Sequence, residues 1–367
     1  MNLADMAQGR DNNLTLLRLL AATAVLVSHS FVLATGDPNT EPLRTWIGMT
    51  PGSIAVDVFF VVSGFLVTAS LAKSRDVLDF VVARCLRIFP ALLVLLVITV
   101  FILGPMVTTV SMSKYFGRQT IVYFVKCATL IKGVAFELPG VFGTNPYKVA
   151  VNGSLWTMPL EVRSYVVLLL TWWATSTIGR FSQRTFLVLT IAIGCSLYGL
   201  LQALQQGESQ FVHTVLPLTM FAFGTVLWQL RKLVQLSWRS FLASAALIGV
   251  TPHVSVSMFY AVYPLALTYA VMFLAFVPSG IVRKYNRMGD YSYGLYLYAF
   301  PIQQLLVLAW PSINPGQMIV SSFASTIFCA VLSWHLIEER ALSMKTNAVS
   351  RLRSIRTRDT LKNPDIT

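Results

Sequence analysis

Charged residues and cysteines are both scarce in this sequence. Only 12% of its 367 residues are charged and 55% are hydrophobic, whereas soluble domains carry about 25% charged residues. The four cysteines are scattered and show no paired spacing, so the sequence supports neither a disulfide framework nor a zinc site, and we expect no metal. This composition excludes an ordinary soluble domain and is typical of a polytopic membrane protein.

Acidic residues are scarcer than basic ones, 15 against 28, which gives a net charge of +13. In a soluble protein this excess would suggest a nucleic-acid partner. Here the basic residues gather in short stretches between long hydrophobic runs, for example Lys73, Arg75, Arg231, Lys232, Arg239, Arg283, Lys284 and Arg287. Basic loops at alternate ends of spans mark the cytoplasmic side of a membrane. We therefore expect contact with membrane lipids and no nucleic acid.

The hydrophobic runs and the charge pattern predict an all-α polytopic membrane protein with about ten transmembrane helices and both termini cytoplasmic. The predicted spans are residues 14–35, 53–72, 85–104, 155–177, 185–204, 211–230, 239–252, 258–278, 291–311 and 316–337.

Two segments fall outside this pattern. Residues 105–154 form a long external loop, in which we interpret 119–136 as a re-entrant or surface-lying segment because Lys126 and Lys132 interrupt it. Residues 344–367 are polar and basic. We predict one integral membrane domain over residues 1–343 and a disordered cytoplasmic tail over residues 344–367.

Arg18 and His29 lie eleven positions apart in the first span. Eleven helical positions complete about three turns, so both side chains fall on one face, about 16 Å apart along the axis. Charged and titratable residues within a span usually face the bundle interior or a wet cavity. The alternative is that Arg18 reaches the cytoplasmic headgroups and that His29 only ends the helix.

Two carboxylates are candidates for catalysis. Asp57 falls near the outer end of the second span, at a depth similar to that of His29, and a carboxylate can orient a histidine that acts as a general base. Asp57 could instead favour the helix dipole from the first turn. Glu161 lies within the apolar fourth span and cannot pair with Arg163, because positions i and i+2 point apart on a helix.

Arg84 and Arg87 lie three positions apart at the cytoplasmic end of the third span. Positions i and i+3 share a helix face, and paired guanidiniums bind phosphate. A topology signal would explain one arginine of the pair, whereas two on one face predict a phosphate site.

Six segments in this order resemble the membrane-bound acyltransferase-3 family. They are the R-x10-H pair at Arg18 and His29, VDVFFVVSGFLV, the R-x-x-R-I-x-P block from Arg84 to Pro90, SLWTMPLEVRSY, YSYGLYLYAFPI and IEERAL. The resemblance spans roughly residues 12–343. It differs from the family pattern at Ala299, where a histidine is common, and at Arg340, where a proline is expected.

The resemblance implies an enzyme that moves acyl groups, commonly acetyl from acetyl-CoA, to hydroxyls of envelope or secreted glycans. It implies essential roles for His29 and Arg18 and also implicates Arg84, Arg87 and Glu161. No bound cofactor is implied, since acetyl-CoA is a substrate. Members of this size resemble O-acetyltransferases of lipopolysaccharide O-antigen and of rhizobial lipo-chitooligosaccharide nodulation factors.

We therefore expect a multi-pass O-acetyltransferase of the bacterial inner membrane that acts on a glycan or lipo-oligosaccharide. CoA phosphates bind Arg84 and Arg87, Arg18 guides the donor inward, and His29, oriented by Asp57, acts as general base or transient acyl carrier. The alternative is a transporter or flippase of a glycan or lipid-linked sugar, in which the same charges line a path. A transporter would favour internal repeats, and none is evident in the sequence.

Overall fold

The computed structural model describes residues 2–362 apart from Arg10, Arg75, Val149, residues 178–182 and residues 207–211. These described residues are largely helical and form no β-strand. Asn2 and Gln235 make one isolated antiparallel bridge, which joins the N-terminus to the loop before α12. The all-α class predicted from the sequence is confirmed.

Every predicted span coincides with a helix. The long helices are α2 (Leu14–Thr35), α4 (Pro51–Lys73), α5 (Val77–Ile98), α9 (Met158–Thr177), α10 (Gln183–Gln206), α11 (Val212–Gln229), α12 (Trp238–Val254), α13 (Val256–Phe276), α15 (Ser292–Ala309) and α16 (Pro315–Ser333).

Short helices connect and extend them. These are α1 (Leu3–Met6), η1 (Pro38–Thr40), α3 (Arg44–Ile47), α6 (Gly104–Val107), α7 (Met112–Tyr115), α8 (Arg118–Thr129), η3 (Gly153–Thr157), α14 (Ile281–Lys284), η4 (Tyr285–Arg287), α17 (Glu339–Ser343), α18 (Lys345–Lys362) and the π-helical segments η2 (Thr99–Leu103) and η5 (Trp334–Glu338).

Five continuous helices among the described residues are long and apolar enough to cross a membrane: Leu14–Thr35, Pro51–Lys73, Val77–Val107, Val256–Phe276 and Pro315–Ser354. The protein is thus an all-helical chain with several membrane-spanning candidates. The count of ten crossings and the cytoplasmic side of the termini stay predictions.

The third span begins earlier than the predicted residue 85. Its helix starts at Val77, because the Asp76 side chain accepts a hydrogen bond from the Asp79 amide and caps the first turn. The π-helical segment η2 then carries the helix on to Val107. Arg84 and Arg87 consequently lie about two turns inside the helix rather than at its start.

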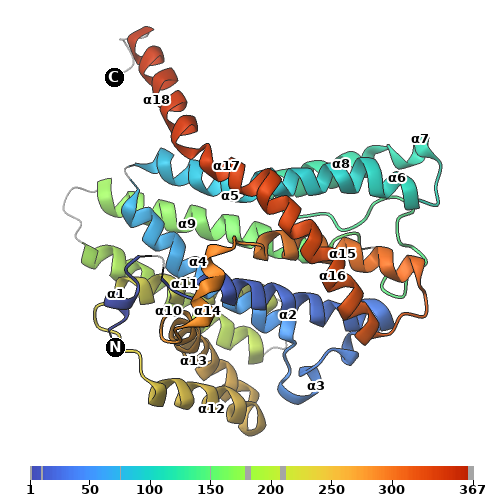
Figure 1. Cartoon of the computed structure of the whole chain (residues 1–367). Helices are drawn as coiled ribbons and strands as arrows, with labels where there is room; N and C mark the ends of the chain where they lie inside the picture. The colour runs from blue at the N-terminus through green and yellow to red at the C-terminus, as the bar shows by residue number, and fades with distance from the viewer. Residues whose placement is uncertain are drawn as a thin grey trace.

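The predicted disordered tail is in part helical, since Lys345–Lys362 forms α18, which projects away from the bundle (Figure 1). This segment contains neither glycine nor proline. Arg353 also forms ion pairs with Asp76 at 2.7 Å and Asp79 at 3.2 Å, which hold α18 against α5. The structure thus describes a helix over Lys345–Lys362, residues 363–367 lie outside the described residues, and the division into a membrane domain and a tail stays a prediction.

The predicted external loop contains the twelve-residue helix α8, which lies beside the end of α5 (Figure 1). At about 1.5 Å per residue α8 is too short to span a bilayer core of about 30 Å. It buries Tyr123 and Cys127 and exposes Ile121 and Val125. This exposed apolar face suits the predicted surface-lying segment.

The helices around the candidate site pack in a chain of neighbours. α2 packs against α4 and α15, α4 against α11, and α15 against α16. The buried Gln303 amide on α15 donates to the Leu26 carbonyl and to Ser30 Oγ on α2, both at 2.8 Å. This buried polar contact fixes α15 against the helix that carries Arg18 and His29.

α4 and α11 cross with their backbones in direct contact. A Cβ atom on Gly64 would overlap the Phe221 carbonyl, and one on Gly224 would overlap the Val61 carbonyl. Small residues at such crossings let two helices approach closely in a membrane. The contact fixes the position of α4, which supplies residues to both cavities described below.

We predict that Gly64→Ala destabilises the protein by about 1–3 kcal/mol, the usual effect of inserting a methyl group into a packed contact. Thermal unfolding of the detergent-solubilised protein would measure it. Gly249→Ala is the matched control, because Gly249 is exposed on α12 and an added Cβ meets nothing within 4 Å. Equal unfolding temperatures for the two variants would contradict the prediction.

Candidate functional site

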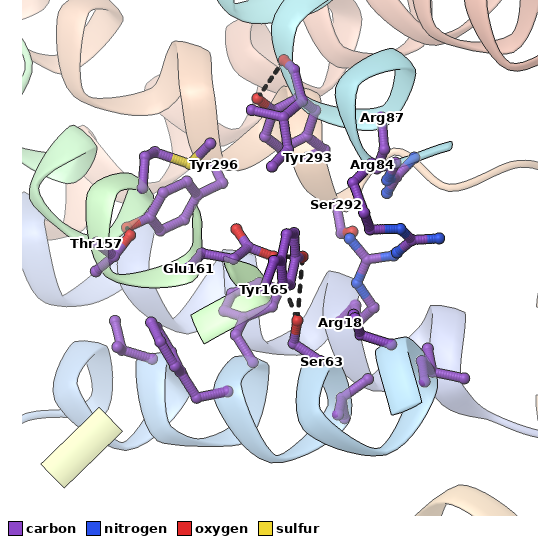
Figure 2. A pocket seen from close by; sticks show the side chains of 18 residues that line it. Arg18, Ser63, Arg84, Arg87, Thr157, Glu161, Tyr165, Ser292, Tyr293 and Tyr296 are labelled. Atoms are coloured by element: carbon purple, nitrogen blue, oxygen red, sulfur yellow. Dashed lines mark hydrogen bonds between the residues drawn. The ribbon is translucent and has the colours of Figure 1, made fainter. Parts of the chain in front are cut away.

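Three of the predicted arginines line one cavity of about 110 Å³, which we call the basic cavity. Arg18 comes from α2, and Arg84 and Arg87 come from α5. Figure 2 shows the three arginines at one end of this cavity, with Thr157 and Tyr296 at the other. The same-face predictions for Arg84 and Arg87, and for Arg18 toward the bundle interior, are therefore consistent with the structure.

Two of these arginines share one carboxylate. Asp290, in the loop before α15, pairs with Arg18 and lies 2.6 Å from Arg87. Arg87 also lies 3.6 Å from Glu338 of η5, which is 1% exposed and accepts a hydrogen bond from Ser333 at 2.9 Å. This network of Arg18, Asp290, Arg87 and Glu338 joins α2, α5, α15 and η5, and we call it the ion-pair network.

The sequence analysis missed Asp290. Burial alone would raise the pKa of this carboxyl, but Arg18, Arg87 and hydrogen bonds from Ser292 outweigh burial and lower the pKa to about 2. The sequence contained a signal for this pairing, because Asp290 is an acidic residue next to the basic stretch at Arg283 and Arg287 that is predicted to be cytoplasmic. Glu338, in the IEERAL segment, is a buried member of the same network.

Arg84 differs from the other two arginines. It forms no ion pair with a carboxylate in the described part of the chain, and its Nη2 contacts Ser70 Oγ at 3.4 Å. Its Nε is buried and has no hydrogen-bond partner within the protein. A half-buried guanidinium with an unpartnered Nε, in a cavity with two more arginines, can bind an anion.

Glu161 projects into the middle of the basic cavity (Figure 2). Its carboxylate accepts hydrogen bonds from the Tyr165 hydroxyl and, at 3.4 Å, from Ser63 Oγ. Its partners are therefore polar neighbours on α9 and α4 and not Arg163, as the helix spacing predicts. Glu161 lies with the arginines and lines a different cavity from His29.

His29 lines a second and larger cavity of about 510 Å³, which we call the outer cavity. Its ring packs edge-on against Phe300, with 5.2 Å between the ring centres. The Nδ1 atom of His29 is buried and has no hydrogen-bond partner within the protein. The imidazole is thus held by packing and keeps a nitrogen that can take or give a proton.

The expected pairing of Asp57 with His29 is not what the structure shows. Both residues line the outer cavity, but Asp57 Oδ2 accepts a hydrogen bond from Tyr263 on α13 at 2.8 Å. No hydrogen bond joins Asp57 to His29 within the described residues. The buried carboxylate is satisfied by the phenol, which ties α4 to α13.

Glu41 is a further carboxylate in the outer cavity, from the loop after α2, that the sequence analysis did not single out. It accepts a hydrogen bond from Ser28, the residue before His29, and lies 3.8 Å from Arg44. Burial raises the pKa of Glu41, while Ser28 and Arg44 act in the opposite direction. Only its position in a polar external loop hinted at this contact.

The two cavities meet at a shared wall, since Val56 of α4 and Tyr296 of α15 line both. Arg18 and His29, on the same stripe of α2, lie on opposite sides of it. No group of three His, Cys, Asp or Glu side chains in the described ranges is placed to hold a metal ion. The site therefore offers an arginine cluster in one cavity and His29 in the other, and two side chains line both cavities.

Comparisons with known proteins identify the family of the chain. A family model described as an acyltransferase domain, Acyl_transf_3, matches residues 11–334. An O-acetyl transferase of Shigella phage Sf6 is 28% identical over 350 residues, which cover 91% of this chain and 96% of that protein. Nodulation protein 10 of Rhizobium leguminosarum bv. viciae is 27% identical over 381 residues, covering 95% and 98%. No solved structure matches significantly.

We predict that Asp290→Asn destabilises the protein by about 3–5 kcal/mol, because it leaves Arg18 and Arg87 without their shared carboxylate. The lowered pKa of Asp290 means that its stabilisation is complete above the unfolded value of about 3.9 and is lost as pH falls through the folded value. The deficit should therefore stay constant between about pH 5 and 8.

Thermal unfolding at several pH values would measure this deficit. The control is Asp11→Asn, because the Asp11 side chain is 76% exposed in its pair with Arg283, and exposed pairs contribute only about 0–1 kcal/mol. An Asp290 deficit no larger than that of the control would count against the ion-pair network as a structural element.

Proposed function

Because the chain belongs to the acyltransferase-3 family and is an acyltransferase, we propose that it moves an acetyl group from acetyl-CoA to a hydroxyl of a glycan. The observation that carries the proposal is the meeting of the basic cavity and the outer cavity at one wall. An arginine cluster suits the phosphates of a CoA donor, and a histidine across the wall suits the activation of a hydroxyl.

The donor end of the proposal begins with Arg84. Among the described residues this guanidinium pairs with no carboxylate, so a phosphate can pair with it without displacing a carboxylate of the protein. Arg18 and Arg87 lie in the same cavity, but a phosphate would compete there with Asp290. We assign Arg84 the first donor contact, with Arg18 and Arg87 as supporting donor-binding residues.

The reaction needs one proton acceptor. As general base, His29 takes the proton of the acceptor hydroxyl while the hydroxyl oxygen attacks the thioester carbonyl carbon. The resulting tetrahedral intermediate expels the CoA thiolate, which takes a proton from the imidazolium, so that an O-acetyl ester and CoA are released. In the acyl-carrier alternative His29 itself attacks the thioester first and then passes the acetyl group on.

The carboxylates have supporting roles in this proposal. Asp57, bonded to Tyr263, places a carboxylate in the outer cavity near the acceptor, where it can contact a sugar hydroxyl. Glu161 faces the donor side from the middle of the basic cavity, where it keeps the Tyr165 hydroxyl in place. Neither side chain makes a hydrogen bond to His29 within the described residues.

For the acceptor we propose an envelope or secreted glycan, such as an O-antigen, an exopolysaccharide or a lipo-chitooligosaccharide nodulation factor. The names of the two relatives support this class. We place the protein in the bacterial inner membrane, with ten spans, cytoplasmic termini and the outer cavity open to the external side. In this orientation a cytoplasmic donor reaches the arginines first.

The test of the function is mass spectrometry of envelope glycans and secreted lipo-oligosaccharides, with and without the gene. We expect one glycan to gain the mass of one acetyl group, and His29→Gln to lower this acetylation by about 10²–10⁴-fold, the usual effect of losing a general base. His335→Gln is the control, because this exposed histidine of η5 contacts Glu339 and Tyr291 and lines neither cavity.

Two results would contradict the proposal. A glycan profile that does not depend on the gene would remove the transferase function. The loss of a general base lowers a rate by about 10²–10⁴-fold. If His29→Gln keeps more than about a tenth of native activity, the loss is too small for that role, and only the assignment of His29 fails.

Arg84→Gln should weaken CoA binding by about tenfold or more, since a charge-assisted hydrogen bond contributes about 1.5–3 kcal/mol. Stability should change little, because Arg84 has no carboxylate partner to leave unpaired. Equilibrium binding of CoA to the purified variant would measure the effect, with Arg163→Gln, on the exposed face of α9, as control. CoA affinity equal to that of the control would exclude Arg84 from the donor site.

A further inference from the structure

Two side chains from different helices are shared by the linings of the two cavities, and we call them the wall. Val56 of α4 and Tyr296 of α15 are each 7% exposed and line both cavities. The arginines lie on one side of this wall and His29 lies on the other. A group placed where the two cavities adjoin therefore lies next to Val56 and Tyr296.

Tyr296 is held in place at its hydroxyl. The hydroxyl donates to the Ser154 carbonyl at 2.6 Å and also lies 2.6 Å from Thr157 Oγ1, both in η3. Its ring packs edge-on against Phe59, with 5.8 Å between the ring centres. Asn152, the residue before η3, adds a hydrogen bond to the Leu297 carbonyl at 2.9 Å.

Val56 is fixed through its own helix. The next residue, Asp57, is hydrogen-bonded to Tyr263 on α13, and two turns further along α4 crosses α11 with backbones in contact at Gly64. Both members of the wall thus belong to well-supported backbone. A wall built this way has a defined size, because neither side chain can move far without breaking a buried contact.

We propose that Val56 and Tyr296 set the length of the acyl chain that the enzyme transfers. The inference rests on the proposed function. When the thioester carbonyl lies where the cavities meet, within reach of a hydroxyl activated on the His29 side, the acyl tail packs against these two side chains. An acetyl tail is one methyl group, whereas a longer tail must displace Val56 or the tethered Tyr296 ring.

The test compares acyl-CoA substrates of increasing length on the full chain, purified in detergent. Affinities for CoA, acetyl-CoA, butyryl-CoA and hexanoyl-CoA are measured at equilibrium. Transfer of each acyl group is then followed by mass spectrometry in membranes that contain the acceptor glycan in its unacetylated form. The readout is the ratio of butyryl to acetyl transfer efficiency, which cancels differences in the amount of folded protein.

Val56→Ala enlarges the space at the wall, and we expect the butyryl-to-acetyl ratio to rise at least about tenfold, the lower end of what one methylene contributes to discrimination in a pocket. Val56→Ile adds a methylene and should move the ratio in the opposite direction. The matched control is Val61→Ala, because Val61 is buried on the same helix and lines neither cavity.

Opposite shifts for the two Val56 variants, with the native ratio in Val61→Ala, would support the proposal. An unchanged ratio in both Val56 variants, or an equal shift in the control, would overturn it. If Val56→Ala fails to fold, the shift in Val56→Ile decides the question. If the native protein transfers acetyl but the ratio is unchanged in the variants, this inference alone fails. If the native protein neither binds acetyl-CoA nor transfers acetyl, the proposed function fails.

Discussion

The structure depends on how an apolar helix bundle accommodates charge. Taking an ion out of water costs several kcal/mol unless a partner compensates for the lost hydration. Arg18, Arg87, Asp290 and Glu338 meet this requirement together, because each guanidinium contacts a carboxylate from another segment. The network ties α2, α5, α15 and η5 together, and three of these elements, α2, α5 and α15, line the basic cavity along with α4 and α9.

The same constraint separates structural charge from charge that is available to a ligand. Arg87 has two carboxylates and the rings of Tyr293 and Trp334 around it. Arg84, one helical turn away, has a serine hydroxyl and a buried Nε without a partner. Two arginines that look equivalent as a pair in the sequence thus have different surroundings, and only one of them is short of partners.

Which candidate site residues share one face of a helix could be predicted from the sequence. The stripe of Arg18 and His29 faces the bundle interior, Arg84 and Arg87 share a cavity, and the hydrophobic runs coincide with helices. Helical periodicity determines such relations within one segment. The partners across segments could not be predicted, because they depend on how helices pack. Asp57 therefore accepts a hydrogen bond from Tyr263 and not from His29, contrary to the prediction. The role of Asp290 and the Val56–Tyr296 wall likewise follow only from the three-dimensional structure.

The unpaired atoms of the two cavities bear on the balance between stability and activity. His29 Nδ1 and Arg84 Nε are both buried without partners in the protein, and each such group costs a folded chain about 1–3 kcal/mol. A sequence selected for stability alone would replace these side chains with apolar ones or surround them with partners. In the proposed function both atoms lie where a donor or an acceptor can supply the missing hydrogen bond. Under the proposed function, selection for thermostable variants would tend to recover proteins altered at these two positions that have lost activity.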